Sequence, residues 1–320
     1  MTVFAVAIQT IDVEDVTSRI FMVNRKPLAN TGINIPEVGL GTYKYRGGVS
    51  PLQAGLQAGA LFIDTAEAYG TEEVVGQAIS GRRQDVFLAT KVSPRHFRRA
   101  DLIQSAEQSL RRLNTDYVDL YQLHWPNYTV PIEETMATME ELVEKGMVRF
   151  IGVSNFTVAE MKRAQRALAK NRITSNQVRY SLAERTIEDG LLQYCEANQV
   201  TVIAFSPLAE GLHNIRQRDP DNVLSKVAQE TGRTPAQVAL NWCLCQSPVV
   251  VIPKADSLEH ALEDCGASGW RLTPEQFRSL SKGVHFDRRG PIERLARRTA
   301  RRALQHFGRN LEATGRVSGS

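Results

Sequence analysis

Short apolar runs alternate with stretches of helical periodicity from about residue 38 to residue 253. Most of these runs lack the apolar–polar alternation of a half-exposed strand, which is the pattern of strands buried on both faces of a parallel sheet. The runs predict eight strands: Val38–Leu40, Leu61–Asp64, Val86–Thr90, Val118–His124, Val148–Ser154, Ser175–Val178, Val200–Phe205 and Val249–Pro253.

Apolar residues recur every three or four positions between these runs, as they do on the buried face of a helix. Thr157 followed by Glu160 predicts a capping box at one helix start, and Pro235 falls in the first turn of another. The predicted helices are Asp101–Leu113, Ile132–Glu144, Thr157–Ala169, Thr186–Asn198, Asn222–Thr231 and Thr234–Cys245.

This order of elements, without a linker or a change in composition, predicts a single-domain α/β protein, a (β/α)8 TIM barrel. An open doubly wound sheet is the alternative, but it needs a Gly-x-Gly-x-x-Gly turn after its first strand. The segment Gly39-Leu-Gly41-Thr-Tyr-Lys-Tyr-Arg-Gly47 has the wrong spacing for that turn. The barrel is therefore the favoured fold.

The barrel is expected to span residues 21–283, after an N-terminal extension at 1–20 and before a basic C-terminal helix and tail at 284–320. Phe21–Lys26 and Ile33–Pro36 flank Asn30-Thr-Gly32, which predicts a hairpin that closes the bottom of the barrel.

The chain has 320 residues and is 42% apolar, enough to bury a large core. No apolar run approaches the about 20 residues of a membrane span, and residues 1–11 lack the basic start and cleavage site of a signal peptide. We therefore expect a cytoplasmic protein without membrane contact. The four cysteines are too scattered for a disulfide framework, and Cys243 and Cys245 lack the second ligand pair of a zinc site, so we expect reduced thiols and no metal.

The formal net charge of +4 is unevenly placed, because residues 283–309 hold eight arginines. The rest of the chain is close to neutral, so no nucleic-acid partner is expected. An amphipathic terminal helix with a solvated basic face is the simplest interpretation, while an anionic partner, a subunit contact or nucleic-acid binding through residues 288–302 stays open. Its apolar stripe is Ile292, Leu295, Ala296, Ala300, Ala303, Leu304 and Phe307, and its basic face is Arg294, Arg297, Arg298, Arg301 and Arg302.

Reacting groups of such barrels lie at the C-terminal ends of the strands. There the predicted strands place Asp64, Lys91 and His124, with Tyr69 five residues after Asp64. A phenol has an ordinary pKa of about 10, and the Lys91 ammonium would lower it by favouring the phenolate. Asp64 would keep Lys91 charged, and His124 could donate a hydrogen bond to a carbonyl oxygen.

This set suits protonation of a carbonyl while a hydride reaches its carbon. None of the four residues can supply a hydride, so a nicotinamide cofactor is required.

Six motifs, in this order and at this spacing, resemble the aldo-keto reductase family. They are Phe62–Gly70, Lys91, Leu123–Trp125, Gly152–Phe156, Phe205–Leu208 and Ile252–Lys254, within residues 22–283. The resemblance implies reversible, NADPH-dependent reduction of aldehydes and ketones to alcohols. It implies that Tyr69 is the proton donor, that Lys91 and Asp64 tune it, and that His124 orients the substrate. Tyr43 and Trp125 would line the substrate pocket.

The same resemblance implies a cofactor site. Ser154, Asn155 and Gln177 would hold the nicotinamide carboxamide, and Phe205 would stack on the ring where the family more often has Tyr. The remaining contacts implied near the nicotinamide and the pyrophosphate are Gly41, Thr42, Asp64, Ser206 and Leu208.

The adenosine end departs from the family pattern. Lys254 stands where the family places a cation against the 2′-phosphate, but Asp256 adds a negative charge nearby. His260 replaces a frequent Arg, and Asp264 replaces an amide that usually meets the adenine. One reliable cation in place of two weakens the preference for NADPH without removing it, so NADPH is expected over NADH.

A second hypothesis uses the same barrel as a binding protein. A redox-sensing regulatory subunit, like the β subunits of potassium channels, would keep the cofactor site and turn over poorly. The complete set of Asp64, Tyr69, Lys91 and His124 favours the enzyme. A small carbonyl compound is the expected partner; nothing in residues 127–131 or 210–221 specifies which one, and the oligomeric state is also open.

Overall fold

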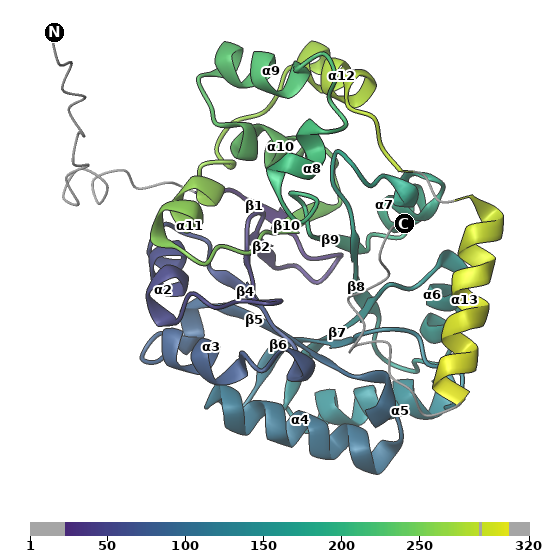
Figure 1. Cartoon of the computed structure of the whole chain (residues 1–320). Coiled ribbons are helices and arrows are strands. Elements are labelled where there is room, and N and C mark those ends of the chain that lie inside the picture. The colour runs from purple at the N-terminus through teal and green to yellow at the C-terminus, as the bar shows by residue number, and fades with distance from the viewer. Residues whose placement is uncertain (1–22, 288–289, 307–320) are drawn as a thin grey trace, which may run out of the picture.

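The computed structural model describes residues 23–287 and 290–306 and shows a parallel eight-stranded barrel, drawn in Figure 1. The barrel closes where Gly39 N donates to Val251 O at 2.8 Å and Val251 N donates to Glu37 O at 2.9 Å. The strands follow one another around the barrel in chain order: β3 Leu40–Gly41, β4 Phe62–Asp64, β5 Phe87–Val92, β6 Val118–Leu123, β7 Val148–Ser154, β8 Ile173–Arg179, β9 Thr201–Phe205 and β10 Val249–Ile252. The TIM-barrel prediction is confirmed.

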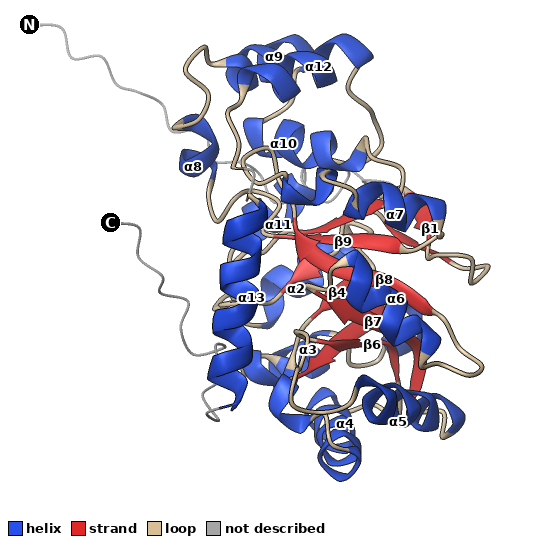
Figure 2. Ribbon diagram, turned by 90° about the vertical axis from the view of Figure 1, so that its right-hand side faces the viewer, coloured by secondary structure: helices blue, strands red, loops and turns tan. Residues whose placement is uncertain are grey.

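Helices surround the sheet in both views (Figures 1 and 2). The α-helices are α2 Val49–Gln57, α3 Glu72–Ala78, α4 Arg99–Leu113, α5 Ile132–Glu144, α6 Val158–Arg166, α7 Leu191–Ala197, α8 Leu212–Arg216, α9 Val223–Thr231, α10 Pro235–Leu244, α11 Leu258–Cys265, α12 Pro274–Gly283 and α13 Pro291–His306. Four 3₁₀ helices are η1 Glu67–Tyr69, η2 Arg83–Asp85, η3 Pro94–His96 and η4 Thr186–Glu188. In the part of the chain that the structure describes, none of the helices is long and apolar enough to cross a membrane.

Most predicted bounds agree with the structure within two or three residues, and the capping box of Thr157 and Glu160 is present. Two predictions were wrong. The first strand is Leu40–Gly41, because Val38 makes only an isolated bridge to Val251. The helix predicted at 186–198 is divided into η4 and α7, because Gly190 has a φ of 96°, a left-handed conformation that interrupts a helix.

A hairpin closes the bottom of the barrel, as predicted. Its strands β1 Arg25–Pro27 and β2 Asn34–Pro36 pair antiparallel, whereas the predicted start at Phe21 lies outside the described residues. Leu28 and Ile35 are fully buried against apolar strand residues inside the barrel. The Lys26 ammonium donates to three carbonyl oxygens of residues 244, 246 and 249 at 2.6–2.9 Å, which ties the hairpin to the start of β10.

Helix α13, yellow in Figure 1, contacts the mouth of the barrel through its last turn. Gln305 Nε2 donates to Pro126 O at 2.8 Å, and Gln305 Oε1 accepts from Tyr128 N at 3.0 Å. The apolar stripe does not pack on the barrel where it is described: Leu295 is 64% exposed, and Ala296, Ala300 and Ala303 are exposed too. The solvated basic face stays a prediction, since most of its arginines have no described side chain; Arg302 is exposed, and the contact with the barrel is made by Gln305. Phe307, residues 1–20 and the tail lie outside the described residues.

Candidate active site

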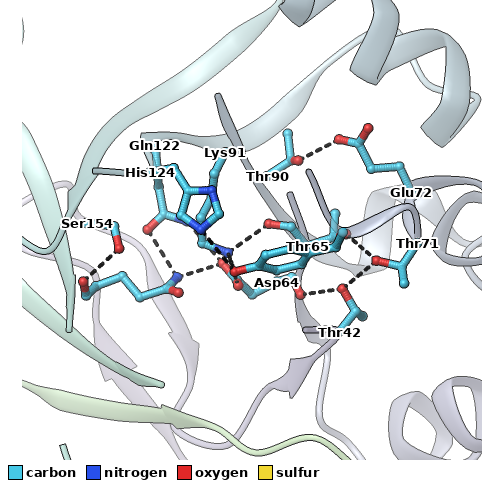
Figure 3. A network of polar contacts seen from close by, with 12 residues as sticks. Thr42, Asp64, Thr65, Thr71, Glu72, Thr90, Lys91, Gln122, His124 and Ser154 are labelled. Atoms are coloured by element: carbon cyan, nitrogen blue, oxygen red, sulfur yellow. Dashed lines mark hydrogen bonds and ion pairs between the residues drawn. The ribbon is translucent and has the colours of Figure 1, made fainter. Parts of the chain in front are cut away.

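Polar side chains of four strands meet inside the C-terminal end of the barrel (Figure 3). Asp64 ends β4, Lys91 lies near the end of β5, Gln122 lies opposite Lys91 on β6, and Gln177 lies on β8. Each is at most 2% exposed. Because charges cannot be buried cheaply without partners, the hydrogen bonds of these groups determine whether the cluster is stable.

Lys91 and Asp64 form a buried ion pair. Lys91 Nζ lies 2.5 Å from Asp64 Oδ1, 2.8 Å from Thr65 O and 3.4 Å from Tyr69 Oη. Three acceptors match the three N–H groups of an ammonium, so the geometry favours the charged form. Burial lowers the pKa of Lys91, and the Asp64 carboxylate opposes that effect.

The second oxygen of Asp64 is also satisfied. Gln122 Nε2 donates to Asp64 Oδ2 at 3.0 Å, and Gln177 Nε2 donates to the same oxygen at 2.7 Å. The sequence analysis missed Gln122. Gln122 could have been found from its position two residues before His124, because residues i and i+2 of a strand point to the same face.

The Tyr69 hydroxyl lies 3.2 Å from His124 Nε2 and 3.4 Å from Lys91 Nζ. Tyr69 ends the short helix η1, and Gly70, with a φ of 68°, ends the turn. Burial and the nearby Lys91 ammonium lower the pKa of His124 to about 3. The imidazole is therefore neutral near pH 7, with one N–H group to donate.

We expect the His124 imidazole to stay neutral as the pH falls from 8 to about 4. A histidine in an unfolded chain takes up its proton at a pH of about 6.5, whereas His124 does so only at about 3. The unfolded state therefore binds more protons between these values, so this residue lowers stability as the pH falls through that window. NMR titration of ¹⁵N-labelled histidines, assigned with His124→Asn, measures it. Protonation of His124 at a pH of about 6.5 would contradict the assignment of a neutral hydrogen-bond donor.

Four rings follow one another at the mouth. The ring centroids of Tyr43 and Tyr69 are 5.1 Å apart, those of Tyr69 and His124 5.4 Å, and those of His124 and Trp125 6.5 Å. Tyr43 is 46% exposed, so this row extends from solvent to the buried ion pair. The structure thus brings the two predicted pocket residues to either side of the predicted proton donor.

The three residues predicted to hold a carboxamide also lie together, next to Asp64. Ser154 Oγ donates to Gln177 O at 2.9 Å, and Asn155 Nδ2 donates to Ser154 Oγ at 2.9 Å and to His124 O at 3.3 Å. The side-chain amide nitrogen of Gln177 donates to Asp64 Oδ2, which leaves its side-chain oxygen as the acceptor that this group can offer. An amide oxygen beside a serine and an asparagine offers the acceptors and donors that a carboxamide needs.

The rest of the predicted cofactor site follows the ends of β3, β9 and β10. Thr42 is buried and donates to Asp64 O at 3.1 Å. Gly41 is needed for packing, since a Cβ there would lie 2.6 Å from Ile252 O. Phe205 ends β9 and is half-buried, and Ser206 after it has a φ of 48°. Leu208 is half-buried in the same loop.

The predicted adenosine end lies on the loop after β10 and on α11. Lys254 forms an ion pair with Asp256, which also accepts from Arg46 N at 2.9 Å. His260 is exposed on the first turn of α11. Asp264 is buried, and burial raises its pKa well above the ordinary value, which favours the neutral carboxyl.

Threonine and glutamate side chains support the site from behind, and the sequence analysis did not single most of them out. Thr71 Oγ1 donates to Thr42 Oγ1 at 2.9 Å and lies 2.9 Å from Thr65 Oγ1 (Figure 3). Thr90, next to Lys91, donates to the buried Glu72 carboxylate at 2.6 Å. Their position in the sequence could have indicated this role, because Thr71 and Glu72 come two and three residues after Tyr69.

This barrel and site define an oxidoreductase, and the chain belongs to the aldo/keto reductase family, whose family model matches residues 38–283. Methylglyoxal reductase YeaE of Escherichia coli (strain K12) is 38% identical over 261 residues, which cover 78% of this chain and 91% of that protein. Aldo-keto reductase YhdN of Bacillus subtilis (strain 168) is 34% identical over 308 residues, covering 79% and 91%. A Klebsiella pneumoniae aldo-keto reductase solved in complex with NADPH has a TM-score of 0.77 and 37% identity, covering 84% and 98%.

Proposed function

We propose that the chain reduces aldehydes and ketones to alcohols with NADPH, and that the reaction runs in reverse when NADP⁺ is in excess. The observation that carries the proposal is the position of the Tyr69 hydroxyl, within 3.2 Å of a neutral imidazole and 3.4 Å of a buried lysine. A panel of carbonyl compounds, assayed by the loss of NADPH absorbance, tests it.

In this proposal Tyr69 and His124 hold the carbonyl oxygen through two hydrogen bonds. NADPH, when bound, supplies the hydride to the carbonyl carbon. Tyr69 donates its proton to the oxygen as negative charge develops there. The resulting phenolate is stabilised by the Lys91 ammonium, which Asp64 keeps in place. The aromatic row defined by Tyr43, Tyr69, His124 and Trp125 would exclude water from one side of the substrate.

The residues present fit the cofactor. Ser154, Asn155 and Gln177 offer complementary groups for the carboxamide, and the flat ring of Phe205 lies at the end of β9, where it could stack on the nicotinamide. A neutral Asp264 carboxyl has one donor and one acceptor, as an amide does, so it could replace the amide expected near the adenine.

Lys254→Ala is expected to weaken NADPH binding about tenfold and to leave NADH binding unchanged. One partly exposed, charge-assisted contact with the 2′-phosphate is worth about 1.4 kcal/mol. Because Asp256 pairs with Lys254, Asp256→Asn should release the lysine and raise the preference for NADPH. Dissociation constants measured by fluorescence for both cofactors check this, and the preference should shrink at high salt. Equal losses for NADPH and NADH in Lys254→Ala would show that the 2′-phosphate is not bound by Lys254.

The substrate class that the relatives support is a small aldehyde. YeaE, which is 38% identical to this chain, and the DkgB proteins, which are 31–35% identical to it, are methylglyoxal reductases. We therefore propose methylglyoxal and similar small dicarbonyls as the first compounds of the panel.

A further inference from the structure

The turn that carries Tyr69 has little backbone support of its own. Helix η1 has three residues, and Tyr69 N donates to Ala66 O at 3.0 Å. Ala68 and Gly70 are exposed and cannot anchor the turn. The side chains that can hold it in place are those of Glu67 and of the flanking Thr65 and Thr71. A proton donor must be held to within a fraction of an ångström, so these ties bear on catalysis.

One side of the turn is held by threonines. Thr65 and Thr71 flank η1, their hydroxyls lie 2.9 Å apart, and Thr71 donates to Thr42 at the end of β3 (Figure 3). This ladder fixes the two ends of the turn to each other and to β3. Its contact with β5 is made at the start of the turn, where Thr65 N donates to Ala89 O at 2.9 Å and Thr65 O accepts from Lys91 Nζ at 2.8 Å.

The other side of the turn is held by Glu67, two residues before Tyr69. Its side chain is 6% exposed although the turn lies at the mouth of the barrel. Glu67 Oε1 accepts from Ser93 N at 2.6 Å and lies 2.9 Å from His96 Nδ1, and Oε2 accepts from Ser105 Oγ. The carboxylate thus connects η1 with the end of β5, with η3 and with α4.

The bond to Ser93 N has a direct geometric consequence. Ser93 follows Lys91 by two residues at the end of β5, so the Glu67 carboxylate joins the backbone that carries the ammonium to the turn that carries the phenol. The partners of Glu67 are Ser93, His96 and Ser105, which are not among the four residues proposed to react. Tyr69 Oη and Lys91 Nζ, which these two segments carry, lie 3.4 Å apart.

We propose that Glu67 is a positioning residue for Tyr69: its carboxylate fixes the tyrosine-bearing turn to the lysine-bearing strand and thereby sets the geometry of proton donation. This inference rests on the proposed function, because it has meaning only if Tyr69 is the proton donor. A carboxylate with three donors suits this task, since each bond is charge-assisted and comes from a different element.

Glu67→Ala is expected to lower kcat for carbonyl reduction about 10- to 100-fold, because a displacement of the donor by about 1 Å costs that much. The dissociation constant for NADPH, measured by fluorescence titration, should change less than about twofold, since Glu67 binds Ser93, His96 and Ser105, which are not residues of the predicted cofactor site. Glu67→Gln should keep kcat within about threefold of wild type. Its amide oxygen can accept from Ser93 N, and its amide nitrogen can donate to the Ser105 hydroxyl.

Glu140 provides a matched control for mere loss of stability. Its carboxylate is buried and has three donors, as that of Glu67 does. The donors are the backbone N–H groups of Ala169, Lys170 and Asn171 at 2.7–2.9 Å, which connect α6 with the start of β8 at the far end of the barrel. Glu140→Ala should lower the melting temperature by an amount similar to Glu67→Ala and leave kcat within about twofold. Similar losses of kcat in the two variants would overturn the proposal.

A double-mutant cycle with Tyr69→Phe gives a readout that a structural role would not move. If Glu67 acts through the tyrosine hydroxyl, Glu67→Ala should cause no further loss in the Tyr69→Phe background. Losses that multiply in the double variant would overturn the inference. If Glu67→Ala does not fold, Ser105→Ala, which removes one donor of the same carboxylate, takes its place with an expected loss of about three- to tenfold in the same cycle.

The two hypotheses fail differently in these measurements. Wild-type turnover in Tyr69→Phe would overturn the proposed function. Loss of turnover in Tyr69→Phe with wild-type turnover in Glu67→Ala would overturn the positioning role alone.

Discussion

Tyr69→Phe is expected to lower kcat for carbonyl reduction by about 10²–10⁴-fold, the usual contribution of one general acid. The hydroxyl lies between His124 Nε2 and Lys91 Nζ, and it is the group at this position that can give up a proton and leave a stabilised anion. His124 is a poor alternative acid, because burial and Lys91 lower its pKa to about 3, so that its acidic, charged form is scarce near pH 7. Steady-state kinetics with NADPH and methylglyoxal measure the effect.

The cofactor provides the internal control for this substitution. Removing one oxygen leaves the Tyr69 ring and its contact with Tyr43, so the dissociation constant for NADPH should stay close to that of wild type. A variant that keeps a tenth of wild-type turnover, with hydride transfer rate-limiting, would show that Tyr69 is not the proton donor. A wild-type protein that binds NADPH and reduces no carbonyl in the panel would favour the regulatory-subunit hypothesis instead.

The proximity of the four proposed catalytic residues could be predicted from the sequence because a parallel barrel brings the C-terminal ends of its strands together. Asp64, Lys91 and His124 each lie at such an end, so the order of the strands was enough to place them near one another. Tyr69 follows by the short turn after β4. The distances among these groups depend on side-chain packing, which the order of the strands does not contain.

The supporting residues were harder to predict because they act across elements that are distant in the sequence. Gln177 was assigned to the cofactor, but its amide nitrogen is also a partner of Asp64, 113 residues away. Glu67 lies within the motif Phe62–Gly70, but its hydrogen bonds could not be predicted, because its partners come from the end of β5, from η3 and from α4. Helix α13 gives a further case, since its contact with the barrel is made by Gln305, which the apolar and basic pattern of the helix does not single out.

Lys91→Met is the second substitution with a large expected effect, and it should change both activity and stability. The Tyr69 phenolate would lose its cation, so kcat should fall by about 10²-fold or more. Asp64 would remain buried as a carboxylate with only the amides of Gln122 and Gln177 as donors. Removing one partner of a buried ion pair costs about 3–5 kcal/mol, which chemical denaturation would measure as a fall in the free energy of unfolding.

The double variant Asp64→Asn/Lys91→Met separates these two effects. It removes both charges, so most of the stability lost in Lys91→Met should return, while kcat should stay low because the cation is still missing. Recovery of activity together with stability in the double variant would show that the ion pair serves only the fold. Wild-type turnover of a folded Lys91→Met at pH 7 would show that proton donation by Tyr69 does not depend on the lysine.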